Sequence, residues 1–367
     1  MSLRGAAAIV GIAELPTQRT NPGRSSLGLI ADVTREVIKD AHIRKEDIDG
    51  IVTEGDSTFP AMAVEYLGLQ NIRFGSGTSM MGASGATAIA HAASAVTNGF
   101  ANYVLVVMGF ARNPAIVPPP EGGGGMGGEL EQPYGPAAGA NTGYAMMYVR
   151  HMAEYGTKPE QLARLAANQR FNAQENPNSA FQGQPISVED VLNSRYVNYP
   201  IHLLECVMPC GGAAAAIVTT ADRARASLNK PAYLLGAGFG VKAEAEWQMD
   251  NLTTTPVARS APTAFAMSGY TPRDIEFAEF YDCYTILESL CLEDSGLVPK
   301  GEIGPFFEST DTTYKGEFPI NTDGGQLSAG QPNLAGGFRH VIEGARQIMG
   351  KAGARQVARN DLCLVNG

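Results

Sequence analysis

Tyr281 and Asp282 place a phenol beside a carboxylate within the segment Tyr-Asp-Cys-Tyr-Thr at residues 281–285. This segment follows an apolar, β-branched stretch at 275–280 and precedes a helix-like stretch at 286–292, so it should lie at the carboxyl end of a strand. Open α/β sheets bind ligands at that end, and a phenol next to a carboxylate is suited to proton transfer. The plainer interpretation is a buried tyrosine that anchors the strand end.

Two glycine-rich turns supply backbone N–H groups. Residues 75–85 lead into a stretch of small apolar residues at 83–96, and residues 324–337 lead into a second apolar helix-like stretch. Free N–H groups and the dipole at a helix N-terminus favour developing negative charge, so the first turn is a candidate oxyanion site. It is not a dinucleotide fingerprint, because Met80 stands where the third glycine would be. Tight backbone packing around a buried helix, or a structural loop, is the alternative.

The cysteines and histidines give weaker indications. The cysteines lack a disulfide framework and suit reduced thiols, and Cys206-x3-Cys210 lacks the usual zinc spacing, so we expect no metal site. His91, His151 and His340 fall within helical stretches, where a hydrogen-bonded core or surface histidine is commoner than a catalyst. The cysteines are Cys206, Cys210, Cys283, Cys291 and Cys363.

The composition is that of an ordinary globular enzyme. The chain has 367 residues, and 27 Lys and Arg against 37 Asp and Glu give a net charge of −10. This acidic balance, without a basic block, excludes the electrostatic footprint of proteins that bind nucleic acid or anionic membranes. Because no apolar run is long enough to span a bilayer and the N-terminus turns polar too soon for a signal peptide, we expect a cytoplasmic protein.

Short β-branched stretches alternate with helix-like stretches along the chain, which is typical of a layered α/β fold. An apolar stripe over residues 27–41 predicts an amphipathic surface helix. Residues 83–96 are small and apolar all round and predict a helix that is buried on every side. The predicted strands are residues 6–12, 50–53, 103–108, 213–219, 232–236, 275–280 and 362–365.

A faint duplication indicates two related halves. Residues 45–53 are similar to residues 272–280, and each segment is followed by a glycine-rich turn that opens an apolar helix. We therefore expect an N-terminal half at 1–225 and a C-terminal half at 226–367. A loop region at about 112–200, which contains a glycine run, is the predicted insertion in the first half.

Taken together, these segments resemble the thiolase superfamily, specifically the branch of sterol carrier protein thiolases and bacterial lipid-transfer-protein thiolase-like enzymes. The resemblance covers nearly the whole chain. It implies two βαβαβ halves in a five-layered α/β/α/β/α fold, an active site at the N-termini of two buried helices, and a glycine-rich loop and closing strand after residue 367. The segments that carry it are AIVGI at 8–12, HMAEYGTKPE at 151–160, NPNSAF at 176–181, GGAAAA at 211–216, EFYDCYT at 279–285, GGQLSAGQP at 324–332 and GKAGARQV at 350–357.

Departures from the thiolase pattern change the chemistry that the resemblance implies. Aligning the family's Cys-x-x-Gly-x-x-Ala pattern with residues 82–88 puts Gly82 where thiolases of this branch keep the nucleophilic cysteine. Tyr281 stands in place of the histidine of the family's His-Asp-Cys-Phe segment, and Gln331 in place of the histidine of Gly-His-Pro. Because all three groups of thiolytic Claisen chemistry are changed, covalent acyl transfer by the thiolase route is not expected.

Without a nucleophile, the chain resembles the steroid side-chain retro-aldolases of the lipid-transfer-protein group, which carry tyrosine in a Tyr-Asp-x-Phe-Thr segment. The resemblance implies cleavage of a 3-hydroxyacyl-CoA, with a thioester enolate as the departing fragment. We expect Tyr281, assisted by Asp282, to transfer the proton, and Gln331 to bind the thioester or the hydroxyl. Those aldolases use a second tyrosine at roughly the place of Gln331, so the second acid or base has no assigned residue here. The oxyanion-binding candidates are Gly82, Ser328, Gly336 and Gly337.

Two alternatives stay open. One is an acetyl-CoA acetyltransferase of thiolase type that uses a thiol from elsewhere, such as Cys283. The other is a non-catalytic thiolase-like subunit, because members of this group can need a zinc-containing OB-fold partner of the DUF35 type. The resemblance further implies a homodimer, and coenzyme A as part of the acyl-CoA substrate rather than as a separate cofactor.

Overall fold

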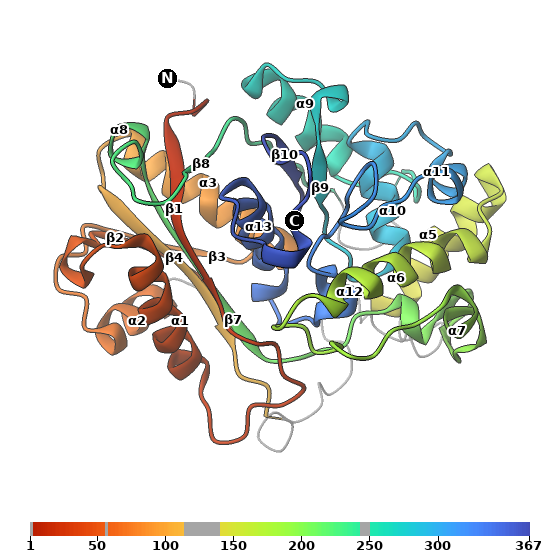
Figure 1. The fold of residues 1–367 in the computed structure, drawn as a ribbon, viewed down its shortest axis with the longest axis horizontal. Coiled ribbons are helices and arrows are strands. Elements are labelled where there is room, and N and C mark those ends of the chain that lie inside the picture. The colour runs from red at the N-terminus through yellow and green to blue at the C-terminus, as the bar shows by residue number, and fades with distance from the viewer. Residues whose placement is uncertain (1–2, 56–57, 114–139, 243–249) are drawn as a thin grey trace.

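Six strands form one mixed sheet in the first part of the chain (Figure 1). The computed structural model describes residues 3–55, 58–113, 140–242 and 250–367. The strand order is β3-β2-β4-β7-β1-β8; β2 pairs in parallel with β3 and β4, so these three strands end at the same edge, whereas β7 runs antiparallel to β4 and β1. The strands are β1 (Ala7–Glu14), β2 (Gly50–Glu54), β3 (Phe74–Thr78), β4 (Tyr103–Phe110), β7 (Gly212–Thr220) and β8 (Ala232–Tyr233).

Helices cover both faces of this sheet. Because neighbouring strand residues point to opposite faces, Ile51 joins the core on one side and Val52 joins the core on the other. The first core lies under α1 and α2, and the second lies between the sheet and the pair α3 and α13 (Figure 1). The predicted amphipathic and all-apolar helices are α1 and α3. The four helices are α1 (Ser26–Ala41), α2 (Phe59–Leu67), α3 (Ser84–Thr97) and α13 (Ala335–Ile348).

A second, smaller sheet lies beyond α3 and α13 (Figure 1). Within the described residues, β9 (Phe277–Glu279) pairs in parallel with β10 (Cys363–Val365), and a single bridge joins Ala278 to Ile320. Its outer side packs on three helices, from which Leu165 contributes to the shared core. The succession helices, sheet, helices, sheet, helices is the predicted five-layered order, with a second sheet much smaller than the first. The outer helices are α6 (Pro159–Gln174), α10 (Thr285–Asp294) and α11 (Ile303–Ser309).

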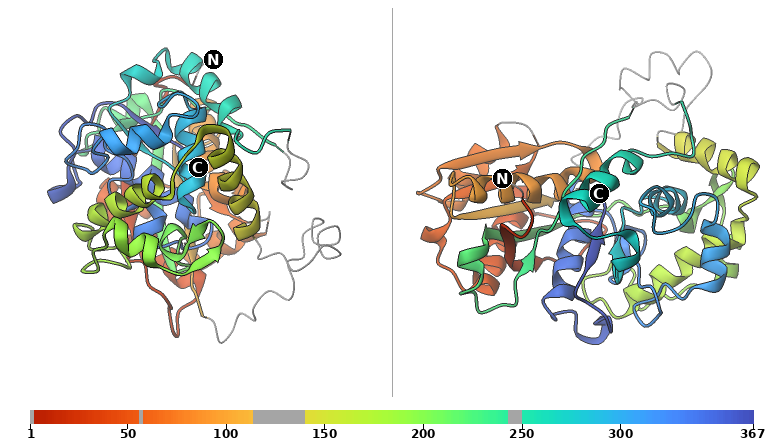
Figure 2. Two further views of the ribbon diagram at one scale, coloured as in Figure 1. Left: turned by 90° about the vertical axis from the view of Figure 1, so that its right-hand side faces the viewer. Right: turned by 90° about the horizontal axis from the view of Figure 1, so that it is seen from above.

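The described part of the region predicted to be the insertion packs on the second sheet's helices rather than on the first sheet (Figure 2). Its helices are α5 (Ala140–Tyr155), α6 and α7 (Val188–Asn193). α5 contacts α10, and α6 contacts α10, α11 and α12 (Gly325–Ala329). The predicted glycine run at 122–128 lies outside the described residues.

The division of the chain at residue 225 stays a prediction. β8 lies past that residue and yet pairs with β1 of the first sheet. Further along, α9 (Val257–Ser268) packs on α10. The remaining short elements are α8 (Ala221–Ala224), β5 (Tyr196–Asn198), β6 (Ile201–His202) and the 3-10 turns Lys45–Asp47, Met81–Ala83, Leu203–Glu205, Pro272–Asp274 and Gly353–Arg355.

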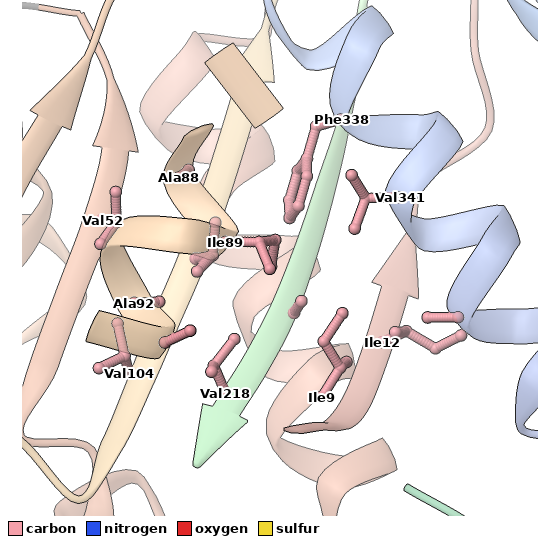
Figure 3. Close-up of a cluster of buried hydrophobic side chains, with 14 of the residues drawn as sticks. Ile9, Ile12, Val52, Ala88, Ile89, Ala92, Val104, Val218, Phe338 and Val341 are labelled. Carbon is pink, nitrogen blue, oxygen red and sulfur yellow. The ribbon is translucent and has the colours of Figure 1, made fainter. Parts of the chain in front are cut away.

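Small residues let α3 and α13 approach closely. A Cβ atom at Gly85 would lie 2.4 Å from Cα of Phe338, so any side chain there would push the two helices apart. Figure 3 shows Ile89 of α3 and Phe338 and Val341 of α13 in the shared core. This packing brings the N-terminal ends of the two buried helices together.

A buried ionic cluster ties α13 to β1. Nη2 of Arg339 lies 3.3 Å from a carboxylate oxygen of Glu14, on β1, and 3.4 Å from one of Asp323, in the turn before α12. All three side chains are almost fully buried. Ion pairs in such surroundings depend strongly on each partner, because an unpaired buried charge is costly.

Glu54 is a second buried carboxylate, at the carboxyl end of β2. One of its oxygens accepts the N–H of Gly109 at 3.2 Å, and within the described residues the other oxygen has no hydrogen-bond partner. Burial raises the pKa of Glu54 to about 7. At pH values between the pKa of Glu54 in the unfolded chain and its pKa in the folded protein, the folded protein therefore binds a proton that the unfolded chain has lost.

We expect Glu54→Gln to stabilise the protein above pH 7. In the wild type, the contribution of Glu54 to the free energy of unfolding is fully present below the ordinary glutamate pKa of 4.5. This contribution falls as the pH rises to about 7, because the folded state then has to ionise a buried carboxyl. This group alone should cost roughly 2–4 kcal/mol at pH 8, and the variant should lack that slope. Urea unfolding from pH 4 to 8 measures it, and parallel slopes for the two proteins would contradict the assignment.

Candidate active site

Three segments far apart in the sequence meet at the N-terminal end of α3. Tyr281 follows β9, Gln331 follows α12, and Gly82 lies in the turn before α3. Nε2 of Gln331 donates a hydrogen bond to the Tyr281 hydroxyl at 3.1 Å. The carbonyl oxygen of Gly82 lies against the start of α13, where a Cβ at Gly337 would be only 1.9 Å from it. These four predicted site residues thus belong to one site.

The ring of Tyr281 occupies the space directly over Gly82. A Cβ atom at Gly82 would lie 2.3 Å from Cε2 and 2.4 Å from Cζ of the tyrosine, far inside van der Waals contact. No side chain therefore fits at position 82 while the ring holds this place. The glycine and the tyrosine depend on each other.

Replacing Gly82 with alanine should displace the Tyr281 ring. Overpacking of this kind costs about 1–3 kcal/mol of stability, and a displacement of about 1 Å in a catalytic group lowers turnover by roughly 10²-fold. The control is Gly28→Ala in α1, where the nearest atom is the hydroxyl of Ser25 at 3.2 Å; this hydroxyl caps the helix by accepting the N–H of Gly28, so a small shift affects the start of α1 and leaves kcat unchanged. Thermal unfolding and kcat measure both effects, and an unchanged kcat for Gly82→Ala would contradict this placement of the ring.

Asp282 anchors α12. Its buried carboxylate accepts the backbone N–H groups of Gln326 at 2.9 Å and Leu327 at 3.0 Å, at the N-terminal end of that helix. Its Oδ1 also lies 3.1 Å from Nε2 of His340. Both carboxylate oxygens of Asp282 are therefore occupied by these contacts. We expect Asp282 to assist Tyr281 indirectly, by holding the neighbouring groups in position.

His340 is the hydrogen-bonded core histidine that the helical context indicates, and it also borders the site. Its buried ring lies edge-on to the Tyr281 ring, with centroids 6.3 Å apart. On α13 it stands four residues after Gly336, so the two share a helix face. The four-residue spacing from Gly336 is the signal in the sequence that could have identified His340 as a neighbour of the site.

The remaining oxyanion candidates differ in position. A Cβ at Gly336 would lie 2.1 Å from Oε1 of Gln326 and 3.1 Å from Cγ of Gln331, so Gly336 borders the site. Ser328 faces α6 instead, where its hydroxyl accepts a hydrogen bond from Nε of Arg170 at 3.1 Å. The structure therefore places Ser328 against α6 rather than beside Tyr281.

Two further side chains adjoin Tyr281. The side chains of Cys283 and Tyr144 pack in the same buried cluster as Tyr281. Tyr144 comes from α5, and its ring packs on Tyr284 with centroids 4.4 Å apart. Sequence reasoning missed Tyr144 because α5 belongs to the inserted region, and nothing in the spacing connects it to the segment at 281–285.

Burial keeps these groups protonated. Burial, followed by the neighbouring Cys283 and Asp282, raises the pKa of Tyr281 well above its ordinary value. Burial likewise raises the pKa of Tyr144, and it raises the pKa of Cys283 to about 12. At neutral pH the site therefore presents neutral phenols and a neutral thiol.

The part of the chain that the structure describes also bears on metal binding, disulfides and membrane insertion. In those residues, no group of three or more His, Cys, Asp and Glu side chains is arranged to hold a metal ion. Each cysteine there is a free thiol. None of the helices with described positions is long and apolar enough to cross a bilayer.

The fold and the site define a thiolase-like protein, and comparisons with known proteins agree. Residues 238–367 match the family model described as Thiolase C-terminal domain-like. A steroid side-chain-cleaving aldolase of Thermomonospora curvata is 31% identical over 364 residues, covering 95% of this chain and 91% of the relative. A 17-hydroxy-3-oxo-4-pregnene-20-carboxyl-CoA lyase of Mycobacterium tuberculosis is 30% identical over 365 residues, covering 95% and 92%.

A solved structure extends this similarity to three dimensions. The structure described as an Ltp2-ChsH2(DUF35) aldolase matches with a TM-score of 0.86 at 30% identity, covering 95% of this chain and 91% of that one. The chain belongs to the thiolase superfamily, in the branch of sterol carrier protein thiolases and lipid-transfer-protein thiolase-like enzymes.

Proposed function

We propose that the protein is an acyl-CoA lyase that cleaves a carbon–carbon bond of a 3-hydroxyacyl-CoA by a retro-aldol reaction, without a covalent acyl-cysteine. The observation that carries the proposal is the Tyr281 ring over Gly82, which puts a phenol in the space that a nucleophilic side chain would need. The aldolase and the lyase named above support the same reaction class. Their names make a steroid side chain the first acyl group to test.

Each part of the reaction has a candidate group. In a retro-aldol cleavage the C3 hydroxyl loses its proton, the C2–C3 bond breaks, and its electron pair moves into the thioester as an enolate. Tyr281 is the proton-transfer group, and Gln331, which donates to the same hydroxyl, orients it. Backbone at the start of α3 and α13, around Gly82, Gly336 and Gly337, is the proposed oxyanion site.

The acyltransferase alternative is disfavoured by the state of the thiols. A thiolate rather than a thiol is the nucleophile, and burial raises the pKa of Cys283 to about 12. The thiol of Cys206, with a pKa that burial likewise raises to about 12, is no better suited. Thiolysis by free coenzyme A is therefore the less favoured reaction.

A DUF35-type partner, a homodimer and a cytoplasmic location are further parts of the proposal. The name of the solved Ltp2-ChsH2(DUF35) aldolase supports the partner. Within the described residues β3 is an edge strand of the first sheet, so a second copy could pair with this edge. Coenzyme A enters as part of the substrate, and no separate cofactor is proposed.

Product analysis tests this function. The protein, alone and with any DUF35 protein that is encoded beside it, is incubated with a 3-hydroxyacyl-CoA, and separately with a 3-ketoacyl-CoA plus free coenzyme A. Mass spectrometry should find a carbonyl product and a shortened acyl-CoA in the first mixture, with no free coenzyme A consumed. Thiolysis in the second mixture, or no product in either mixture with and without the partner, would overturn the proposal.

A further inference from the structure

Tyr281 lies just past the end of a strand, so its position depends on what holds the chain there. Within the described residues, the ladder between β9 and β10 ends at Glu279. Phe280 follows, is fully buried, and directly precedes Tyr281. Buried backbone groups beyond the last ladder pair need other hydrogen-bond partners, because leaving them unpaired is costly.

A single side chain, that of Asn321, supplies both partners. Its Oδ1 accepts the N–H of Phe280 at 2.7 Å, and its Nδ2 donates to the carbonyl oxygen of Phe280 at 2.9 Å. Two paired residues in an antiparallel ladder exchange both bonds in the same way. The carboxamide of Asn321 therefore replaces a neighbouring strand at the residue before Tyr281.

Asn321 also begins the turn that leads to the other side of the site. Its carbonyl oxygen accepts the N–H of Gly324 at 2.8 Å. This turn continues into α12, and Gln331 follows α12. Asn321 thus joins the two segments that meet where Gln331 donates to the Tyr281 hydroxyl.

The surroundings of Asn321 keep its side chain in one orientation. Its φ is 48°, in the left-handed region where asparagine is enriched among residues other than glycine. Nδ2 makes a second bond, to Oε1 of Glu288 on α10 at 3.1 Å, and Oε2 of Glu288 accepts from Nε2 of Gln169 on α6 at 2.6 Å. All of these side chains are buried. Because both donor hydrogens of Nδ2 and the acceptor Oδ1 are engaged, the carboxamide cannot turn away from Phe280.

We propose that Asn321 is the positioning residue of the site: it holds Phe280 and thereby sets the Tyr281 hydroxyl at hydrogen-bond distance from Gln331. This inference rests on the proposed lyase function. Asn321 is fully buried and its carboxamide bonds only protein atoms, so it acts on turnover through Tyr281 rather than by contact with substrate. Its loss should therefore lower kcat and leave KM nearly unchanged.

Steady-state kinetics of two variants test the effect on turnover. Asn321→Gly removes the carboxamide but accepts the left-handed backbone, and it should lower kcat for cleavage of a 3-hydroxyacyl-CoA by roughly 10²-fold, the cost of a displacement of about 1 Å. Asn321→Asp keeps the acceptor for the Phe280 N–H and should lose less, about tenfold. KM should stay within about threefold of the wild type in both.

The matched control is Asn229→Gly. The side chain of Asn229 also donates to two backbone carbonyl oxygens, those of Val10 at 2.8 Å and Asp40 at 2.7 Å, which belong to β1 and α1. This variant should leave kcat unchanged. Thermal unfolding of each variant checks that it is folded.

Two further measurements separate positioning from a general loss of stability. Adding Asn321→Gly to Tyr281→Phe should lower kcat no further than Tyr281→Phe alone, because no hydroxyl is left to position. Amide hydrogen exchange over residues 277–283, measured by mass spectrometry without substrate, should be about tenfold faster in Asn321→Gly and unchanged in Asn229→Gly. All measurements use the full chain, and the kinetics include a DUF35 protein if cleavage requires it.

Several outcomes would overturn the positioning role. These are a wild-type kcat in Asn321→Gly, a raised KM with kcat unchanged, a further fall of kcat in the double variant, or unchanged exchange over residues 277–283. If Asn321→Gly fails to fold, Asn321→Asp carries the same measurements. A wild type that cleaves no 3-hydroxyacyl-CoA would count against the lyase function itself, whereas the exchange measurement needs no substrate, which keeps the two failures distinct.

Discussion

Replacing Tyr281 with phenylalanine should abolish cleavage and leave the fold intact. The variant retains the ring over Gly82 and loses only the hydroxyl that Gln331 hydrogen-bonds. Loss of a positioned proton-transfer group typically lowers kcat by roughly 10²–10⁴-fold. Because the ring still fills the same space, we expect little change in the melting temperature.

The measurement is product formation from a 3-hydroxyacyl-CoA by mass spectrometry, with the melting temperature recorded in parallel. The control is Tyr103→Phe, which removes a tyrosine hydroxyl at the start of β4, away from the carboxyl edge of the parallel strands. Unchanged turnover in the Tyr281→Phe variant would contradict the assignment of Tyr281 as the proton-transfer residue.

Replacing Arg339 with methionine should destabilise the protein by roughly 3–5 kcal/mol. Methionine keeps much of the side-chain volume, but Glu14 and Asp323 lose the cation that lies 3.3 Å and 3.4 Å from them. The carboxylates then carry charge in a buried place with less compensation. The loss should be larger at pH 8 than at pH 5, because removing the cation raises the pKa of Asp323 and protonation at lower pH relieves the uncompensated charge.

Urea unfolding at the two pH values measures this effect. The matched control is Arg359→Met, which removes an exposed arginine that pairs with Glu276 at 2.9 Å and should cost less than about 1 kcal/mol. The double variant Arg339→Met with Asp323→Asn should recover part of the loss, since it removes the charge that was left unpaired. Equal destabilisation by the buried and the exposed variant would contradict the role given to the cluster.

The hydrophobic periodicity of the sequence was sufficient to predict much of the fold. The stripe at 27–41 and the all-apolar stretch at 83–96 correspond to α1 and α3, because each pattern reflects how many faces of the helix are buried. The strand predicted at 232–236 is only Ala232–Tyr233, and it pairs with β1 rather than with the second sheet. The partner of a strand depends on contacts between distant segments, which local propensity does not predict.

The candidate site was likewise predicted in part from the sequence. Gly82, Tyr281, Gln331 and Gly337 were predicted and come together, whereas Ser328 packs against α6 although it lies in the same glycine-rich turn. The direction of a side chain from a short helix depends on how that helix is anchored, and here Asp282 holds the N-terminal end of α12.

The sequence by itself determined the thiolase-like scaffold and predicts Gly82 at the nucleophile position, because residue identities at motif positions are local facts. Only the tertiary structure decided what occupies the space beside Gly82. The Tyr281 ring lies where the side chain of residue 82 would be, and Tyr144 of α5 packs in the same buried cluster as that ring. Both relations depend on distances between segments that meet only when the two sheets and the inserted region pack together.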